Sequence, residues 1–123
     1  MTVTAYTLAV LLDLFCVFLG YRFLFQPGPA AAGYGVPADP AGDARAYLSI
    51  KGLRDGTFGL LGLVLLAFAG AGAEALFMLC VALVPLVDTL IVLRNGGTKA
   101  VAFGIHFATA VVVLISAGLL FAV

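Results

Sequence analysis

Apolar residues run along the chain in four long stretches, separated by short segments that are polar or rich in glycine and proline. Each stretch approaches or exceeds the length of about 20 residues that a helix needs to cross a bilayer. None alternates strictly, and each is about twice as long as the strand of a membrane β-barrel. The pattern therefore predicts an all-α chain with four transmembrane helices, over Thr4–Phe25, Tyr47–Gly70, Ala75–Arg94 and Ala100–Ala122.

The connections between these helices are unequal. Residues 26–46 include four of the five prolines and four glycines, which favours a turn-rich re-entrant or surface loop rather than a helix. Ala71–Glu74 and Asn95–Lys99 are short enough to make neighbouring helices antiparallel. We therefore expect one transmembrane domain over residues 1–123, an integral membrane bundle built of two antiparallel hairpins.

Composition and charge agree with lipid as the surrounding solvent. Hydrophobic residues make up 64% and charged residues 10% of the chain, against roughly 45–50% and 25% in soluble domains. The net charge of zero gives no support for a nucleic-acid partner. The N-terminal stretch lacks a basic start and contains Asp13, unlike a cleaved signal. Cys16 and Cys80 lie in apolar runs, so we expect no metal site and no cofactor.

The basic residues predict an orientation in the membrane. All six fall at the ends of the first and third predicted helices or near the starts of the second and fourth: Arg22, Arg45, Lys51, Arg54, Arg94 and Lys99. They therefore lie on one side, and the positive-inside rule assigns that side to the cytoplasm. We expect a multi-pass protein of the cell membrane with both termini outside and with loops 26–46 and 95–99 in the cytoplasm.

Ionisable residues inside the predicted spans are the candidates for chemistry, because each costs roughly 2.5–3.5 kcal/mol on insertion scales. Asp55, Asp88 and His106 come from three helices and would lie at a similar depth, roughly 9–12 Å below the basic side by the helical rise. Tyr21 and Arg22 end the first helix near the same level. We expect these groups to form one polar layer.

Helical spacing places several of these groups at packed seams. Lys51 and Asp55 share a face at i, i+4, beside a ridge of small residues at Gly52, Gly56 and Gly59. His106 lies between two alanines at the same spacing, Ala102 and Ala110. Pro85 removes the backbone hydrogen bond to Val81 and opens the helix near Asp88.

Each of these residues also has a structural interpretation. Lys51, Arg54 and Arg94 fit snorkelling to headgroups, and Asp55 fits an ion pair with Lys51 or Arg54. His106 fits a hydrogen-bonded packing residue. Asp13, the deepest acid, is either protonated and hydrogen-bonded or part of a pathway. Glu74, the only charge in the opposite turn, is expected to face water.

Four motifs stand out along the chain: Ala31-Ala-Gly-Tyr-Gly-Val-Pro37, Tyr47-Leu-Ser-Ile-Lys-Gly-Leu-Arg-Asp55, Pro85-Leu-Val-Asp88, and Asn95-Gly-Gly with the downstream His106. Together they resemble a family of small membrane proteins, domain of unknown function 4267. The resemblance spans nearly the whole chain and implies a four-helix membrane fold. It supplies no catalytic residue.

Three functions fit these features. The first is an intramembrane acid–base enzyme, of the hydrolase or isomerase type, that acts on a lipophilic epoxide or ketone. Asp88 or His106 would be its base, Asp55 its acid or water-positioning group, and Arg54 or Lys51 the stabiliser of negative charge. The predicted substrate-binding residues are Lys51, Tyr21, Arg22, Tyr34, Arg94 and Asp13. The second is a proton-coupled transporter or channel subunit, expected to be a homodimer, with Asp13 and Asp88 as coupling sites. The third is a structural or accessory membrane subunit.

Overall fold

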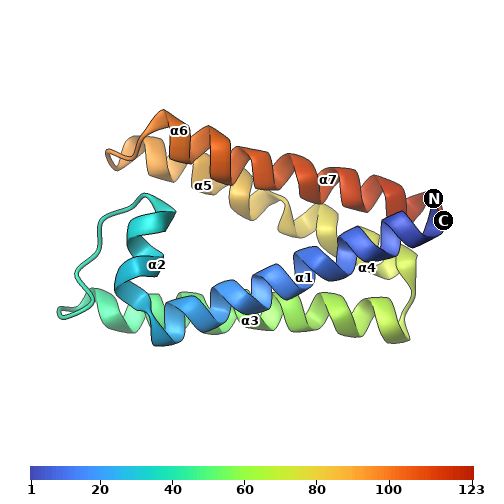
Figure 1. Cartoon of the computed structure of the whole chain (residues 1–123), viewed down its shortest axis with the longest axis horizontal. Helices are drawn as coiled ribbons and strands as arrows, with labels where there is room; N and C mark the ends of the chain where they lie inside the picture. Colours follow the sequence, from blue (N-terminus) through green and yellow to red (C-terminus); the bar gives the residue numbers. More distant parts are fainter.

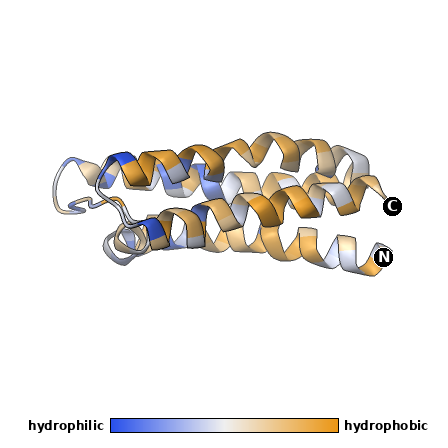
Figure 2. Cartoon of the chain, turned by 90° about the horizontal axis from the view of Figure 1, so that it is seen from above, coloured by the Kyte–Doolittle hydropathy of each residue, from blue (hydrophilic) through white to orange (hydrophobic).

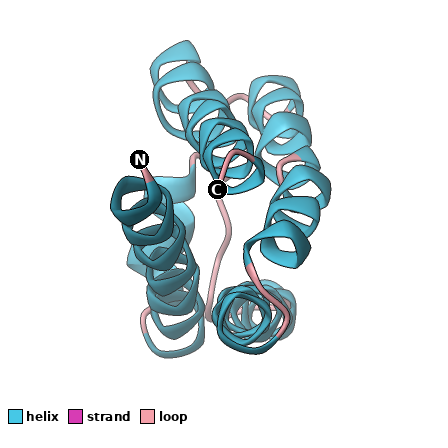
Figure 3. Cartoon of the chain, turned by 90° about the vertical axis from the view of Figure 1, so that its right-hand side faces the viewer, coloured by secondary structure: helices cyan, strands magenta, loops and turns pink.

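The computed structural model describes residues 1–123, and all of its regular structure is helical. Figure 3, which looks along the molecule from the end that holds both termini, shows helices and loops and no strand. The elements in chain order are α1 (Thr2–Phe25), α2 (Pro27–Tyr34), α3 (Ala44–Phe68), α4 (Ala71–Val81), α5 (Leu83–Arg94), α6 (Lys99–Val101), the π-helix η1 (Ala102–Phe107) and α7 (Ala108–Phe121).

The long helices run side by side along the molecule (Figure 1). α4 continues into α5, and α6 continues through η1 into α7. Both termini and the turn between α3 and α4 lie at one end, which we call the terminal end. The connections 26–43 and 95–98 lie at the other, which we call the basic end. The predicted gathering of Lys and Arg is confirmed, and Figure 2 shows hydrophilic residues concentrated at that end.

Three segments are long and apolar enough to cross a membrane: Thr2–Phe25, Ala71–Arg94 and Lys99–Phe121. The predicted count of four is not confirmed by this measure. α3 has 25 residues, but Lys51, Arg54 and Asp55 all lie within it. Those charges make α3 less apolar than the other long helices. Large apolar side chains nevertheless face outward along its whole length, including Leu53, Leu60 and Phe68.

A helix in the segment 26–46 corrects the expectation of a loop without helix. Pro27 and Pro29 fall in the first turn of α2, where a backbone N–H has no helical partner to lose. Gly35 ends the helix in the left-handed conformation, with φ of 92°. A Cβ at Gly35 would come within 2.6 Å of Val101, so both the backbone angle and the space favour glycine. α2 thereby packs at the basic end.

The closest helix contact joins α1 and α3. The small residues predicted on α3 lie against α1, and a Cβ added to Gly20 would come within 2.6 Å of the Gly56 Cα. Gly52 and Gly59 meet the α1 backbone in the same way. In lipid, where apolar burial does not drive helices together, such close backbone packing holds them. We call this contact the glycine seam.

Replacing Gly20 with alanine should destabilise the fold, by about 1–3 kcal/mol as in other overpacked cores. The new methyl group would meet backbone atoms of α3, which cannot rotate away. Gly118→Ala is the matched control, because nothing lies within 4 Å of the added Cβ. Unfolding in detergent measures both variants. If Gly20→Ala were as stable as Gly118→Ala, the seam would not be as tight as described.

Candidate functional site

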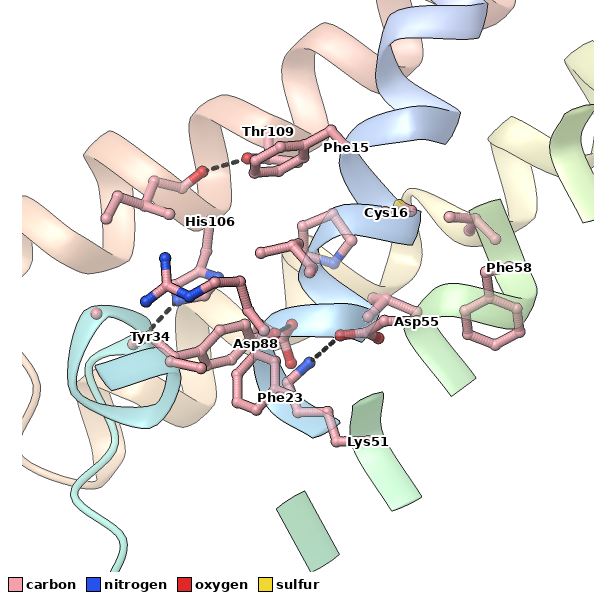
Figure 4. Close-up of a pocket in the computed structure, with 18 of the residues that line it drawn as sticks. Phe15, Cys16, Phe23, Tyr34, Lys51, Asp55, Phe58, Asp88, His106 and Thr109 are labelled. Atoms are coloured by element: carbon pink, nitrogen blue, oxygen red, sulfur yellow. Dashed lines mark hydrogen bonds and ion pairs between the residues drawn. The ribbon is translucent and has the colours of Figure 1, made fainter. Parts of the chain in front are cut away.

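A cavity of about 210 Å³ opens at the basic half of the bundle. Its walls are mostly apolar, with Phe15, Phe23 and Phe58 among them. Seven polar side chains also line it: Arg22, Tyr34, Lys51, Asp55, Asp88, His106 and Thr109. Figure 4 shows Tyr34 of α2, Lys51 and Asp55 of α3, Asp88 of α5 and His106 of η1 turned toward one another. The predicted polar layer of Asp55, Asp88 and His106 therefore lines one cavity.

Tyr34, the last residue of α2, is the centre of the polar network. Its hydroxyl donates a hydrogen bond to Oδ2 of Asp88 on α5. Burial, and next the charge of Asp88, raise the pKa of Tyr34, so the phenol stays protonated and remains a donor. Its ring packs edge-on against the His106 ring, with centroids 4.3 Å apart. Tyr34, which lies in the segment between α1 and α3, thus joins α2 to α5 and η1.

Lys51 and Asp55 form the second polar element. The Lys51 Nζ lies 2.8 Å from Oδ2 of Asp55, which confirms the shared face expected from their spacing. The same ammonium lies 4.2 Å from the centre of the Tyr34 ring and 4.7 Å from that of Phe23. Two aromatic faces and a carboxylate therefore hold the cation at the cavity wall.

His106 lies on η1 with 3% of its surface exposed. Its flanking residues Ala102 and Ala110 are fully buried, as the spacing predicted. Nε2 lies 2.7 Å from the backbone oxygen of Tyr34. A carbonyl oxygen only accepts, so Nε2 carries the proton and Nδ1 is the nitrogen left to exchange one. The π-helix, a feature that often accompanies functional sites, sets this position.

The helix break beside Asp88 follows from Pro85. Proline has no N–H to donate to Val81 and crowds its carbonyl, and the α4–α5 helix is interrupted at Ala82, one residue later. One turn later, the Thr89 hydroxyl donates a hydrogen bond to the backbone oxygen of Pro85 at 2.8 Å. Asp88 follows this break by two turns and faces the cavity.

Arg22 is a cavity residue without an acidic partner. Its Nε is buried and has no hydrogen-bond acceptor in the protein. Its guanidinium carbon lies 5.9 Å from the ring centre of Phe18, one turn earlier on α1. Arg22 therefore presents a cation and donor groups that are not taken up by a carboxylate.

Four predicted site residues lie outside this cavity. Tyr21, Arg54 and Arg94 are exposed, and Asp13 is buried elsewhere in the bundle. Arg54 adjoins Asp55 in sequence, but successive helical residues point about 100° apart, which turns Arg54 away. Tyr21 faces outward by the same geometry and packs on Phe25. The Tyr34–Asp88 pair was not foreseen, because no local pattern reports a contact across 54 residues.

The raised pKa of Tyr34 predicts that its phenol resists alkaline ionisation in the folded protein. Burial and Asp88 both oppose the phenolate, so the neutral form persists to higher pH while the fold holds. Phenolate absorbance should therefore rise equally in wild type and Tyr34→Phe as pH increases. A larger rise in folded wild type than in the variant would contradict this environment.

Comparison with known proteins places the chain in a family. No curated protein and no solved structure matches it. The model of the family described as Domain of unknown function (DUF4267) matches residues 14–120. That range includes every residue that lines the cavity. This protein therefore belongs to the DUF4267 family, as its motifs predicted.

Proposed function

We propose that this protein is an intramembrane acid–base enzyme that acts on a small lipophilic molecule with an oxygen function, such as an epoxide or ketone. One observation carries the proposal: Asp88, hydrogen-bonded by Tyr34, shares an apolar-walled cavity with the Lys51–Asp55 ion pair and His106. Convergent polar groups in a mostly apolar pocket are typical of a small-molecule site.

The size and charge of the cavity favour a compact, neutral substrate. Its volume of about 210 Å³ lies below the roughly 300–1,000 Å³ of sites for drug-sized ligands. Two cations and two carboxylates line it, Arg22 and Lys51 with Asp55 and Asp88, so their formal charges cancel. A neutral molecule that offers an acceptor oxygen fits this balance better than a free acid or amine.

In the proposed reaction, Asp88 transfers the proton, and Arg22 and Lys51 stabilise the negative charge that develops on oxygen. With a ketone, Asp88 removes the proton on the carbon next to the carbonyl, and the electron pair moves onto the oxygen. Arg22 and Lys51 stabilise that charge. In a ketone whose next two carbons are joined by a double bond, the proton returns to the far carbon of that bond and the double bond moves next to the carbonyl, which completes an isomerisation. With an epoxide, Asp88 takes a proton from water, whose oxygen bonds to a ring carbon as the ring C–O bond breaks. The ring oxygen then takes up the proton that Asp88 removed from the water, which restores the Asp88 carboxylate.

Asp55 and His106 support this chemistry. Asp55 fixes the Lys51 ammonium at the wall, and His106 offers Nδ1 as a second proton acceptor. Arg54 has no part in this version, because its side chain is exposed and lies outside the cavity. The transport alternative needs Asp13 and Asp88 together. Since Asp13 does not line the cavity, the enzyme is the better-supported function.

Asp88→Asn and His106→Ala test these roles in purified protein supplied with a panel of lipophilic epoxides and ketones. Asp88→Asn should lower turnover of an accepted substrate about 10²–10⁴-fold, the range for loss of a general base. Asp43→Asn is the control, because that carboxyl group is exposed and caps nothing. Turnover at the wild-type rate in both site variants would remove them from the reaction.

We further propose that α3 is a fourth span, so that both termini lie outside the cell and the basic end lies in the cytoplasm. The glycine seam binds α3 along α1, and a helix so attached can keep Lys51 and Asp55 off the lipid. All six Lys and Arg then lie on the side that the positive-inside rule favours.

Cysteine labelling tests this topology. In a background without Cys16 and Cys80, the variants Val3→Cys and Val123→Cys should both react with an impermeant maleimide on intact cells. Asp39→Cys, in the connection between α2 and α3, should react only after permeabilisation. Three spans would put the termini on opposite sides, and then only one terminal cysteine would be labelled from outside.

A further inference from the structure

A second pair of acidic side chains is buried away from the cavity, toward the terminal end. Asp13 on α1 is 4% exposed, and Glu74 on α4 is fully buried. This corrects the expectation that Glu74 faces water. The turn between α3 and α4 is tight, and α4 begins at Ala71, so its fourth residue is already inside the bundle. The two carboxyl groups lie within hydrogen-bonding reach of each other.

No cation compensates this pair. Glycines face Asp13 from α3, and Glu74 is the one titratable group that acts on it from the packed helices. Asp13 in turn is the one titratable group that acts on Glu74. Three of the carboxyl oxygens have no hydrogen-bond donor in the protein: both oxygens of Glu74, and Oδ2 of Asp13. Ser116 on α7, which packs against both α1 and α4, is also fully buried with an unpartnered hydroxyl.

The backbone of α3 leaves room for the Asp13 carboxyl group. A Cβ at Gly62 would overlap both of its oxygens, and a Cβ at Gly59 would overlap the Asp13 backbone oxygen. The group is therefore held in a recess of the glycine seam and cannot turn toward lipid or water. The surrounding core consists of alanine and larger apolar residues of α1, α4 and α7.

Two unpaired carboxylates cannot both remain charged in such a place. Burial of each charge without a partner is costly, and the two charges repel each other. A proton held between them removes one charge and forms a short, strong O–H···O⁻ bond. A metal ion is a poorer occupant. Calcium takes about 6–8 oxygen ligands, and nowhere in the structure do three His, Cys, Asp or Glu residues come together to hold one.

We propose that Asp13 and Glu74 form a proton-binding site inside the membrane. The site is independent of the cavity and rests on no step of the proposed enzyme reaction. It holds α1 against α4 only while the proton is bound. Because the exposed acids of an unfolded chain have already lost that proton at neutral pH, the folded protein binds one proton more there and loses stability as pH rises.

The sequence offers an unusually specific probe, since Glu74 is the only glutamate in the chain. Full-length protein made with ¹³C in the glutamate carboxyl group, in liposomes, reports this one residue by infrared spectroscopy. We expect the signal of a protonated or proton-sharing carboxyl group at neutral pH, and a change of that signal in Asp13→Asn. A free carboxylate at neutral pH, identical in wild type and Asp13→Asn, would overturn the proposal.

Unfolding as a function of pH gives a second readout. One extra bound proton makes the unfolding constant rise up to tenfold per pH unit, from about pH 4, where exposed acids ionise, up to the pH at which the folded site loses its proton. Glu74→Gln, which mimics the protonated group, should flatten that dependence, and Asp43→Asn should retain it. An undiminished slope in a folded Glu74→Gln variant would also refute the site. If that variant does not fold, the labelled wild-type protein still decides.

Discussion

The glycine seam between α1 and α3 is the contact on which the other features depend. Helices in lipid gain little from burying apolar side chains against one another, so their association relies on close packing. Gly20, Gly52 and Gly59 allow two backbones to approach until a single added carbon would overlap. That approach fixes the rotation of α3, and the rotation in turn directs Lys51 and Asp55 to the cavity. The same seam provides the recess for Asp13.

α2 connects the α1–α3 pair to the helices on the other side of the cavity. The α1–α3 pair supplies one wall of the cavity, and α5 with η1 supplies another. Tyr34 connects them through its hydroxyl to Asp88, its ring to Lys51 and its backbone oxygen to His106. Each contact satisfies a polar or charged group that would otherwise be costly to bury. The connection between two helices is thus a structural part of the site, rather than a linker.

The periodicity of the sequence predicted contacts within one helix but not contacts between segments that are far apart in the chain. The i, i+4 spacing gave the Lys51–Asp55 pair and the buried face of His106, because a helix fixes both within one turn. α2 was missed because proline and glycine usually break helices, although the first turn and the C-terminal cap accept them. The partner of Asp88 depends on tertiary packing. Glu74 was expected to face water because a single charged residue beside a turn belongs to no periodic pattern that would indicate which face of the helix it lies on.

The two groups of acids show how charge is arranged along this bundle. Near the basic end, Asp55 has an ammonium partner and Asp88 a phenol donor. Further toward the terminal end, Asp13 and Glu74 have only each other. An acid in lipid persists either by acquiring a donor or by keeping a proton. Asp13 and Cys16 lie almost one turn apart on α1, and Cys16 lines the cavity. α1 therefore borders the cavity with one residue and contributes to the buried acid pair with another, less than one turn away.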